Sequence, residues 1–396
     1  MDKINFFPDN LDVQNQKIIL RLDLNVPLKD KIIKDDTRIA LCLPFIKKLI
    51  EKKAKIIIIS HLGRPKGVRD PDLSLIPIYK YIKKSLETNV YFFMGNFDNE
   101  VEDKFSHLKQ GEIILVENIR YFKEETDDDE NFSKKLGSLG DIYINDAFSC
   151  SHRKQASIHK ITKYVNKSYG GPLLKKEIDA IKLVIQNKRR PVTCIIGGSK
   201  ISTKINVITS LIEKVNNLII VGAMANNFFV YKKLKVGKSL IEKNTNGIIQ
   251  KIYKKADQNN CKILIPEDCM VGTNFDGEGK NKNIGKIEND EIILDIGLKT
   301  ISRIIDIINQ SNTVLWNGPA GYFENKNFSN GTIAIAKTIS KNTLEKSLIS
   351  VLGGGDTVAA INKSENKFSF SHLSTAGGAF LEYLEGKDLP GLSVLK

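Results

Sequence analysis

The chain has 396 residues, which is too long for a single ordinary core and predicts two domains. Hydrophobic residues make up 41% of it, which excludes disorder, and no run approaches the roughly 20 apolar residues of a membrane span. The net charge of +14 allows either a nucleic-acid partner or anionic metabolites. Because the lysines are dispersed among acids and no basic block carries interleaved aromatics, we favour small anionic substrates over nucleic acid.

The cysteines and the first residues predict a cytoplasmic location. The five cysteines are scattered without C-x-x-C spacing, which is typical of reduced thiols rather than of disulfides or a zinc site. The opening MDKINFFPDN carries acidic residues and no apolar core, so we expect no secretory signal.

Short apolar runs recur along the chain, and each ends in a polar or glycine-rich segment. Near-continuous apolar runs indicate strands buried on both faces, as in parallel sheets. They cover residues 17–27, 55–65, 112–121 and 141–149, and then 192–200, 217–224, 262–268, 313–321 and 348–357. Helices are predicted between them, among others over 36–53, 201–215 and 300–310. This alternation predicts a doubly wound α/β architecture.

The segment 165–190 is predicted to separate the two halves. It contains a glycine pair, a helix of about 15 residues by its apolar spacing, and a basic stretch before Pro191. We expect an N-terminal domain over 1–170, an interdomain helix over 171–190 and a C-terminal domain over 191–374.

Basic side chains follow the predicted strands of the first half: Arg21, Arg38, His61, Arg64, Arg120 and Arg153. The carboxyl ends of parallel strands share one edge of a sheet, and arginine matches phosphate and carboxylate groups with paired hydrogen bonds. Each arginine alone is better explained by a surface ion pair, and Arg21 and His61 equally well by structural contacts. Together they predict a pocket for a small, multiply anionic molecule.

Glycine turns dominate the second half. The run LGGGDTVAAI (352–361) allows close backbone approach, and a helix that starts near Asp356 would offer free N–H groups to an anion. Asp356 is a candidate Mg²⁺ ligand, although alone it is better explained as a helix N-cap. GGSKISTK (197–204) places Lys200 and Lys204 four residues apart and therefore on one helical face, where they could bind a polyphosphate. Without the neighbouring glycine turn, they would be interpreted as two solvated lysines.

Several common motifs are missing. No P-loop is present, and no G-x-G-x-x-G opens a βαβ unit, which weakens the alternative of a dinucleotide-dependent dehydrogenase. The segment 272–283 lacks the ligand spacing of a calcium loop and is interpreted as an ordinary loop. The acidic stretch 124–130 is expected to be a solvated helix start.

Motifs along essentially the whole chain resemble the phosphoglycerate kinase family. They are LRLDLNVP, DDTRI, SHLGRP, ENIRY, NDAFS–SHR, GGPLLKKEI, GGSKISTKI, PED, WNGPAGYFE, GGGDT and SHLSTAGGAFLEYLEGKDLPG, of which the glycine-rich motifs of the last third are highly specific. The resemblance implies two Rossmann-like lobes around an interdomain cleft, a tail over 375–396 that returns to the N-terminal lobe, and a monomer. It implies reversible phosphoryl transfer from 1,3-bisphosphoglycerate to ADP, giving 3-phosphoglycerate and ATP, with Mg²⁺.

The resemblance also assigns site residues. Phosphoglycerate contacts fall on Asp23, Asn25, Arg38, His61, Leu62, Gly63, Arg64, Arg120 and Arg153. Nucleotide contacts fall on Lys200, Lys204, Asn317, Glu324, Gly354, Gly355, Asp356 and Thr357, with Asp356 as the Mg²⁺ ligand. The implied catalytic residues are Arg38, Lys200 and Gly354. Because a carboxylate acceptor is already ionised at neutral pH, no general base is required, and positioning with charge neutralisation supplies most of the catalysis.

The chain departs from the family pattern on both sides of Arg153. The family usually has Gly-Thr where this chain has Ser149 and Cys150, and a small-plus-polar pair where it has Lys154 and Gln155. We expect the first change to affect the local loop geometry, and neither change falls on an implied contact residue.

Overall fold

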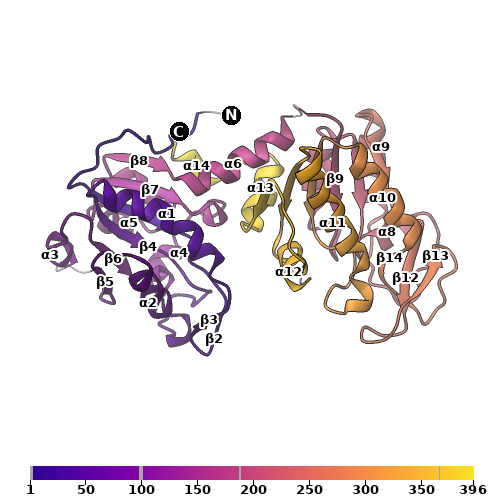
Figure 1. The fold of residues 1–396 in the computed structure, drawn as a ribbon, viewed down its shortest axis with the longest axis horizontal. Helices are drawn as coiled ribbons and strands as arrows, with labels where there is room; N and C mark the ends of the chain where they lie inside the picture. Colours follow the sequence, from indigo (N-terminus) through magenta and orange to yellow (C-terminus); the bar gives the residue numbers. More distant parts are fainter. Residues whose placement is uncertain (1–2, 98–100, 187–188, 365) are drawn as a thin grey trace. The chain divides into compact units, whose positions relative to one another are not determined.

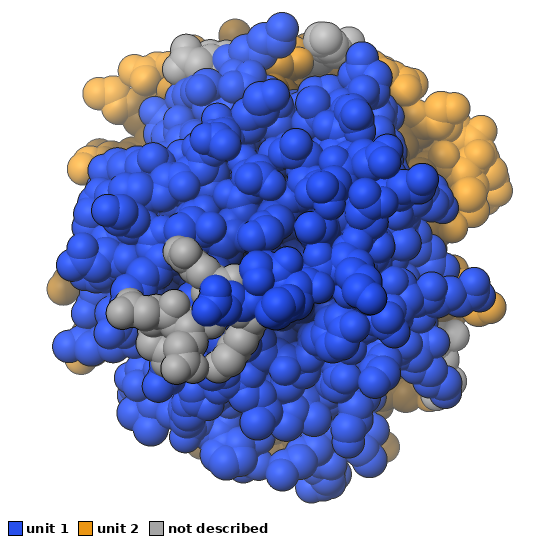
Figure 2. All heavy atoms as spheres, turned by 90° about the vertical axis from the view of Figure 1, so that its left-hand side faces the viewer, with its two compact units in different colours: residues 1–177, 388–396 blue, residues 178–387 orange. Residues whose placement is uncertain are grey.

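The computed structural model describes residues 3–97, 101–186, 189–364 and 366–396. The chain divides into two compact units, coloured separately in Figure 2: unit 1 comprises residues 1–177 and 388–396, and unit 2 comprises residues 178–387. Each unit contains a six-stranded parallel sheet flanked by helices (Figure 1), which confirms the predicted α/β class. None of the described helices combines the length and the apolar character needed to cross a bilayer.

Unit 1 is built on a sheet with the strand order β5-β6-β4-β1-β7-β8, in which every neighbouring pair is parallel. The strands are β1 (Lys17–Leu22), β4 (Lys55–Ile59), β5 (Val90–Phe93), β6 (Ile113–Val116), β7 (Ile142–Asp146) and β8 (Lys167–Gly170). The helices are α1 (Thr37–Glu51), α2 (Ile76–Ser85), α3 (Val101–Ser106), α4 (Lys123–Thr126) and α5 (Glu130–Gly137). A small hairpin joins β2 (Leu28–Lys29) to β3 (Ile32–Ile33).

The strands of this sheet are apolar throughout because successive side chains enter two different cores. Ile18 and Leu20 of β1 pack with Ile39 of α1 on one face, and Ile19 packs with Phe132 of α5 on the other. The segments that follow β1, β4, β6 and β7 therefore lie at one edge of the sheet, where the predicted basic residues are found.

Unit 2 contains a second parallel sheet, with the strand order β11-β10-β9-β15-β16-β17. Its strands are β9 (Val192–Ile196), β10 (Asn217–Ile220), β11 (Lys262–Leu264), β15 (Thr313–Asn317), β16 (Ile349–Gly353) and β17 (His372–Ser374). Its helices include α7 (Ile205–Ile212), α8 (Ala225–Tyr231), α9 (Asn246–Gln258), α10 (Leu298–Gln310), α11 (Asn330–Glu345), α12 (Gly355–Lys363) and α13 (Gly378–Leu384).

A three-stranded antiparallel sheet in unit 2 was not predicted. It has the order β13-β12-β14, formed by β12 (Asp268–Gly272), β13 (Lys280–Asn283) and β14 (Ile292–Ile296). The interpretation of 272–283 as an ordinary loop is therefore wrong at its end, because β13 pairs with β12. The β13 sequence KNKN has no apolar residue and gave no strand signal.

Two segments link the units along the chain. Helix α6 (Pro172–Ile185) runs across the division at residue 177. The tail that belongs to unit 1 starts at Asp388 and contains α14 (Pro390–Ser393). It is tied there by hydrogen bonds from Gly391 N to Ser151 O, 2.9 Å, and from Asn5 N to Leu395 O, 2.7 Å. The preceding helix α13 packs on α7 in unit 2.

Candidate active site

Four arginines of unit 1 place positive charge near His61, which lies two residues after β4. Burial holds the pKa of this imidazole well below its usual value, and the positive charges that lower it further come from Arg21, Arg120, Arg38 and Arg153. The His61 ring is therefore neutral at physiological pH, and its Nδ1 lies 3.5 Å from Arg21 NH2 and 3.8 Å from Cys150 Sγ. Four cations from four separate segments of the chain share one region of unit 1.

Arg38, at the start of α1, is held by the segment that follows β1. Its NH1 donates to Asp23 Oδ2 at 2.7 Å and to the carbonyl oxygen of Asn25 at 3.0 Å. The side chain of Asn25 contacts the loop after β4, where its Oδ1 accepts a 2.9 Å hydrogen bond from Gly63 N. Asp23, Asn25, Arg38 and Gly63 are thus joined by direct contacts.

Arg120 is the most buried of the predicted arginines after Arg21, at 6% exposed. Its NH1 donates to Gly63 O at 3.0 Å and its NH2 to Gln155 Oε1 at 3.3 Å. Burial lowers its pKa to about 10. Within the described part of the chain its buried Nε has no hydrogen-bond partner. A buried cation with an unused hydrogen-bond donor destabilises the folded protein unless an anion pairs with it. Arg120 is therefore suited to an anionic ligand.

Arg21 has a structural role, which settles one alternative left open by the sequence. It is fully buried, and its Nε donates to Ser157 Oγ at 2.9 Å. Ser157 Oγ in turn donates to Glu125 Oε1 at 2.7 Å. Glu125 is also fully buried, and burial raises its pKa. The expectation that 124–130 is simply solvated is therefore wrong at Glu125, which supports Arg21 behind the cluster.

The other predicted residues of unit 1 lie in the same loops with different exposure. Leu62 is buried, and its carbonyl accepts a 2.7 Å hydrogen bond from Asn118 Nδ2. Arg64 is exposed. Arg153 is half-buried, and its Nε lies 3.3 Å from His152 Nε2.

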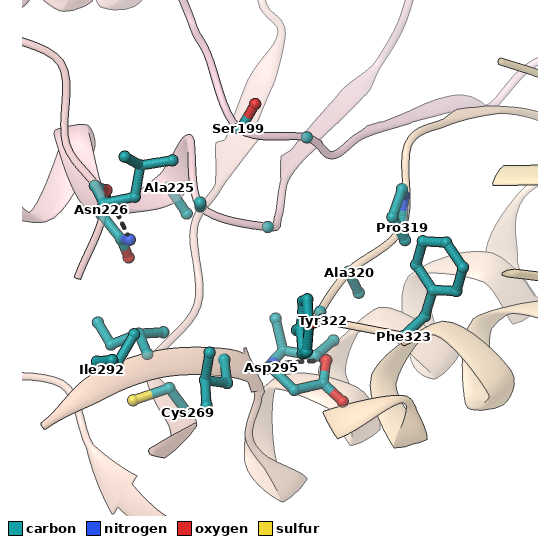
Figure 3. A pocket seen from close by; sticks show the side chains of 18 of the residues that line it. Ser199, Ala225, Asn226, Cys269, Ile292, Asp295, Pro319, Ala320, Tyr322 and Phe323 are labelled. Carbon is teal, nitrogen blue, oxygen red and sulfur yellow. Dashed lines mark hydrogen bonds between the residues drawn. The ribbon is translucent and has the colours of Figure 1, made fainter. Parts of the chain in front are cut away.

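Unit 2 contains a largely apolar pocket of about 500 Å³ (Figure 3). Figure 3 shows Ala225 on α8, Ile292 on β14, and Pro319 and Phe323 on the loop after β15 surrounding this space. Of the predicted residues, Glu324 and Asp356 line it, and both are exposed. Its apolar walls were missed from the sequence, where such residues cannot be distinguished from those of the core.

A network of hydrogen bonds adjoins this pocket. Lys204 Nζ donates to Gly197 O at 2.6 Å and to Asn317 Oδ1 at 2.7 Å, and Asn317 Nδ2 donates to Gly353 O at 2.7 Å. Thr357 Oγ1 accepts from Gly318 N at 2.7 Å and donates to Gly353 O at 3.0 Å. Burial lowers the pKa of Lys204 to about 8, and the nearby Asp356 partly offsets this effect.

Lys200 and Lys204 do not share a helical face, and this prediction is wrong. Helix α7 begins at Ile205, and the preceding residues form turns. The carboxylate of Glu242 holds these turns, because it accepts hydrogen bonds from Ile201 N at 2.6 Å and Ser202 N at 3.1 Å. Lys200 is exposed, whereas Lys204 folds back onto the glycine turn.

The turn before α12 requires glycine. Gly354 has φ +103°, and a Cβ atom at this position would lie 2.6 Å from Asn317 Nδ2. Gly354 is the N-cap of α12, with Gly355 and Asp356 in the first turn, so Asp356 is not the side-chain cap that the sequence alone favoured. Free backbone N–H groups and an exposed carboxylate thus meet at the start of a nine-residue helix.

Comparisons with known proteins agree across nearly the whole chain. The family model for phosphoglycerate kinase matches residues 8–387. The chain is 45% identical to phosphoglycerate kinase of Wolbachia pipientis wMel over 98% of both chains. It is 42% identical to that of Dictyoglomus turgidum, over 97% of this chain and 96% of the relative.

Solved structures give the same result. Phosphoglycerate kinase from Coxiella burnetii superimposes with a TM-score of 0.88 at 37% identity, covering 98% of this chain and 97% of the other. The enzyme from Pyrococcus horikoshii superimposes with a TM-score of 0.80 at 28% identity, covering 98% of both chains.

Proposed function

The chain belongs to the phosphoglycerate kinase family, and we propose from this premise that each unit holds one of the two substrates. The enzyme transfers the acyl phosphate of 1,3-bisphosphoglycerate reversibly to ADP, giving 3-phosphoglycerate and ATP in glycolysis. The observation that carries the assignment of substrates is the set of contacts that joins Arg38 and Arg120 through Asn25 and Gly63, together with the Nε donor of Arg120, which is unused among the described residues. We further propose functional domains at 1–170 and 191–374, a connecting segment over 171–190 that contains helix α6, and a tail over 375–396, of which residues 388–396 belong to unit 1.

The proposed phosphoglycerate site uses the basic cluster of unit 1. Its contact residues are Asp23, Asn25, Arg38, His61, Leu62, Gly63, Arg64, Arg120 and Arg153. The arginines bind the carboxylate and phosphate groups, because guanidinium matches both. The Asp23 carboxylate can only accept hydrogen bonds, and the hydroxyl group is the only donor on fully ionised 3-phosphoglycerate. Asp23 therefore recognises that hydroxyl.

The proposed nucleotide site is the pocket of unit 2. The apolar walls suit the base and sugar, and Glu324 at the pocket can accept hydrogen bonds from sugar hydroxyls. The phosphates lie toward Lys200, Lys204 and Asn317 and the turn Gly354–Thr357, where backbone N–H groups are free. Gly354 permits the phosphates to approach the backbone closely, since a side chain there would meet Asn317.

Asp356 fits a Mg²⁺ ion carried by the nucleotide. Among the described residues no group of three or more His, Cys, Asp or Glu side chains forms a metal site, so a cage made only of protein ligands is not supported. Mg²⁺ commonly takes one or two carboxylates together with substrate phosphates and water, and the exposed Asp356 lines the pocket. When bound, Mg²⁺ would neutralise phosphate charge.

The proposed mechanism needs no proton transfer at the acceptor. The carboxylate of 3-phosphoglycerate is already ionised, so the protein orients the reactants and neutralises the moving phosphoryl group. Arg38 and Lys200 supply positive charge, and the backbone N–H groups from Gly354 onward stabilise the phosphates. We also propose that the enzyme is a cytoplasmic monomer that acts on small molecules and not on nucleic acid.

Binding of each substrate to site variants tests this assignment. Lys204→Ala should weaken ADP binding measured by calorimetry at least tenfold and leave 3-phosphoglycerate binding unchanged, since a positive charge beside the proposed phosphate positions is lost. Arg64→Ala, an exposed residue, should do the reverse. If Lys204→Ala affected 3-phosphoglycerate instead of ADP, the two sites would have to be exchanged.

A further inference from the structure

Ser149 contacts the proposed phosphoglycerate site, although the sequence motifs assigned no contact to this residue. It lies, half-buried, in the single turn Phe148–Cys150 that follows β7. Its hydroxyl donates to Asp23 Oδ2, the same oxygen that accepts the 2.7 Å bond from Arg38 NH1. We propose that Ser149 is a positioning residue that orients Asp23 and, through it, Arg38 for phosphoglycerate. This inference rests on the substrate assignment proposed above.

The Asp23 carboxylate has few remaining places for a ligand. Each carboxylate oxygen offers about two lone-pair positions. Ser149 and Arg38 occupy Oδ2, and the backbone N of Asn25 occupies one position of Oδ1 at 3.1 Å. Counting the contacts of the described residues, one position of Oδ1 is then left for a substrate hydroxyl. The Ser149 hydrogen bond thus sets the rotation of the carboxylate and aims its remaining lone pair.

The same contact acts on Arg38. One of the two bonds from Arg38 NH1 ends on Asp23 Oδ2 and the other on Asn25 O. A carboxylate that turns would therefore weaken one of these two bonds and loosen the position of the guanidinium. Both side chains are mostly screened from water, at 12% exposed for Asp23 and 25% for Arg38, so a bulk-water molecule is a poor substitute for the Ser149 hydroxyl.

The hydroxyl of Ser149 is not needed to hold its own loop. The turn is closed by backbone hydrogen bonds from Cys150 N to Ala147 O, Ser151 N to Phe148 O and Arg153 N to Cys150 O, each 3.0 Å. The side chain of Ser149 donates to Asp23, 126 residues earlier in the chain, and its Oγ also lies 3.7 Å from the Sγ of Cys150 in the same turn. This chain has a hydroxyl where the family usually has glycine. Because the backbone hydrogen bonds close the turn without it, loop closure does not explain the serine.

A double-mutant cycle tests the proposal in the complete enzyme. The variants are Ser149→Ala, Asp23→Asn and the combination, with steady-state kinetics in the direction of 3-phosphoglycerate and ATP. We expect Ser149→Ala to lower kcat/KM for 3-phosphoglycerate about tenfold, the scale of one hydrogen bond to a charged group, with KM for ATP unchanged. In the Asp23→Asn background the same substitution should cost less than about twofold, because its partner is already altered. Ser149→Thr, which keeps the hydroxyl, should restore at least half of the wild-type kcat/KM.

The control is Ser138→Ala, since Ser138 is exposed in the same unit and donates only to the backbone oxygen of Lys135. It should leave all constants unchanged. Equal losses from Ser149→Ala in both backgrounds, or no loss in the wild-type background, would overturn the positioning role while leaving the substrate site intact. If Asp23→Asn itself left kcat/KM for 3-phosphoglycerate unchanged, both the site assignment and the role of Ser149 would fail.

Discussion

The two units bind anionic groups by different means. Unit 1 uses charged side chains at strand ends, and these cations are already engaged with the protein: Arg38 with Asp23, and Arg120 with Gly63 and Gln155. Unit 2 uses a glycine turn, free backbone N–H groups and apolar walls, and its half-buried cation Lys204 donates its hydrogen bonds to neutral oxygens. The first arrangement fixes the geometry of a small, highly charged substrate. The second suits a larger ligand of which only one end is charged.

This contrast has a consequence for how substitutions act. Removing an arginine from unit 1 takes one hydrogen-bond donor away from its acidic or carbonyl partner and also removes charge from the reacting groups. Removing a group from unit 2 mainly changes how tightly the phosphates are held. The first kind of change should therefore appear in kcat, and the second in nucleotide affinity.

Arg38→Ala should have the largest effect. Arg38 lies at a helix N-terminus, which is electrostatically poor for a cation, and Asp23 together with a bound anion offsets this cost. We expect kcat to fall roughly 10²–10³-fold with a much smaller change in KM, as for loss of one preorganised donor. Arg38→Lys should recover little, because an ammonium group cannot reproduce the planar fork.

The measurement is steady-state kinetics with circular dichroism to confirm folding. Arg69→Ala is a matched control, since Arg69 is exposed in the same unit and bonds only Asn96 at 3.2 Å among the contacts of the described residues. A near-normal kcat for Arg38→Ala would make Arg38 a bystander and move the charge-neutralising role to another cation.

Asp356→Ala should reveal the metal dependence of unit 2. We expect affinity for ADP in the presence of Mg²⁺ to fall about tenfold, while affinity for ADP in EDTA stays the same or rises, since a negative charge has been removed. Calorimetry with and without EDTA measures both, and Asp306→Ala on the exposed face of α10 serves as control. An equal loss of affinity in both conditions would contradict a role in binding Mg²⁺.

Gly354→Ala tests whether backbone geometry matters more than charge in unit 2. The added Cβ would lie 2.6 Å from Asn317 Nδ2, and φ +103° is strained for any L-residue. We expect ADP affinity to fall about fivefold, which corresponds to about 1 kcal/mol, the lower end of what such a strained residue costs. Gly247→Ala is the control, because a Cβ there meets no atom within 4 Å. Equal ADP affinity in both variants would show that the turn tolerates a side chain.

The sequence predicted unit 1 better than unit 2. Arginine and histidine after apolar runs are chemically explicit, so the basic cluster could be predicted from the order of residues alone. The residues that support it could not, because Glu125, Ser149 and Gln155 reach it from loops whose positions depend on tertiary packing. No local pattern distinguishes a serine that bonds a site carboxylate from one that faces water.

In unit 2 the sequence identified the glycine turns but not what surrounds them. The pocket walls, such as Ile292 and Phe323, have the composition of ordinary core. Helix α7 starts four residues later than periodicity predicted, since Glu242 from a distant segment holds the preceding turns. A local sequence pattern can predict neither which apolar residues line a ligand pocket nor where tertiary contacts shift the start of a helix.

The smallest expected effect is a pH-dependent change in thermal stability at Lys204. Its pKa in the folded protein is about 8, below the ordinary value of 10.5, because the ammonium group is buried. Between these values the unfolded chain binds more protons, so the stability of the folded protein rises with pH. From pH 7 to pH 9 this amounts to about 1 kcal/mol, or about 2–4 °C in Tm for a domain of this size.

Lys204→Met removes the titrating group, so the Tm of wild type should rise relative to that of the variant over this range. Scanning calorimetry of both proteins at several pH values measures the difference, and adding ADP should shrink it, because phosphate charge favours the ammonium form. A constant Tm difference between pH 7 and pH 9 would mean that Lys204 keeps an ordinary pKa. Unit 2 would then hold its phosphates with a fully solvated cation, as the exposed Arg64 does in unit 1.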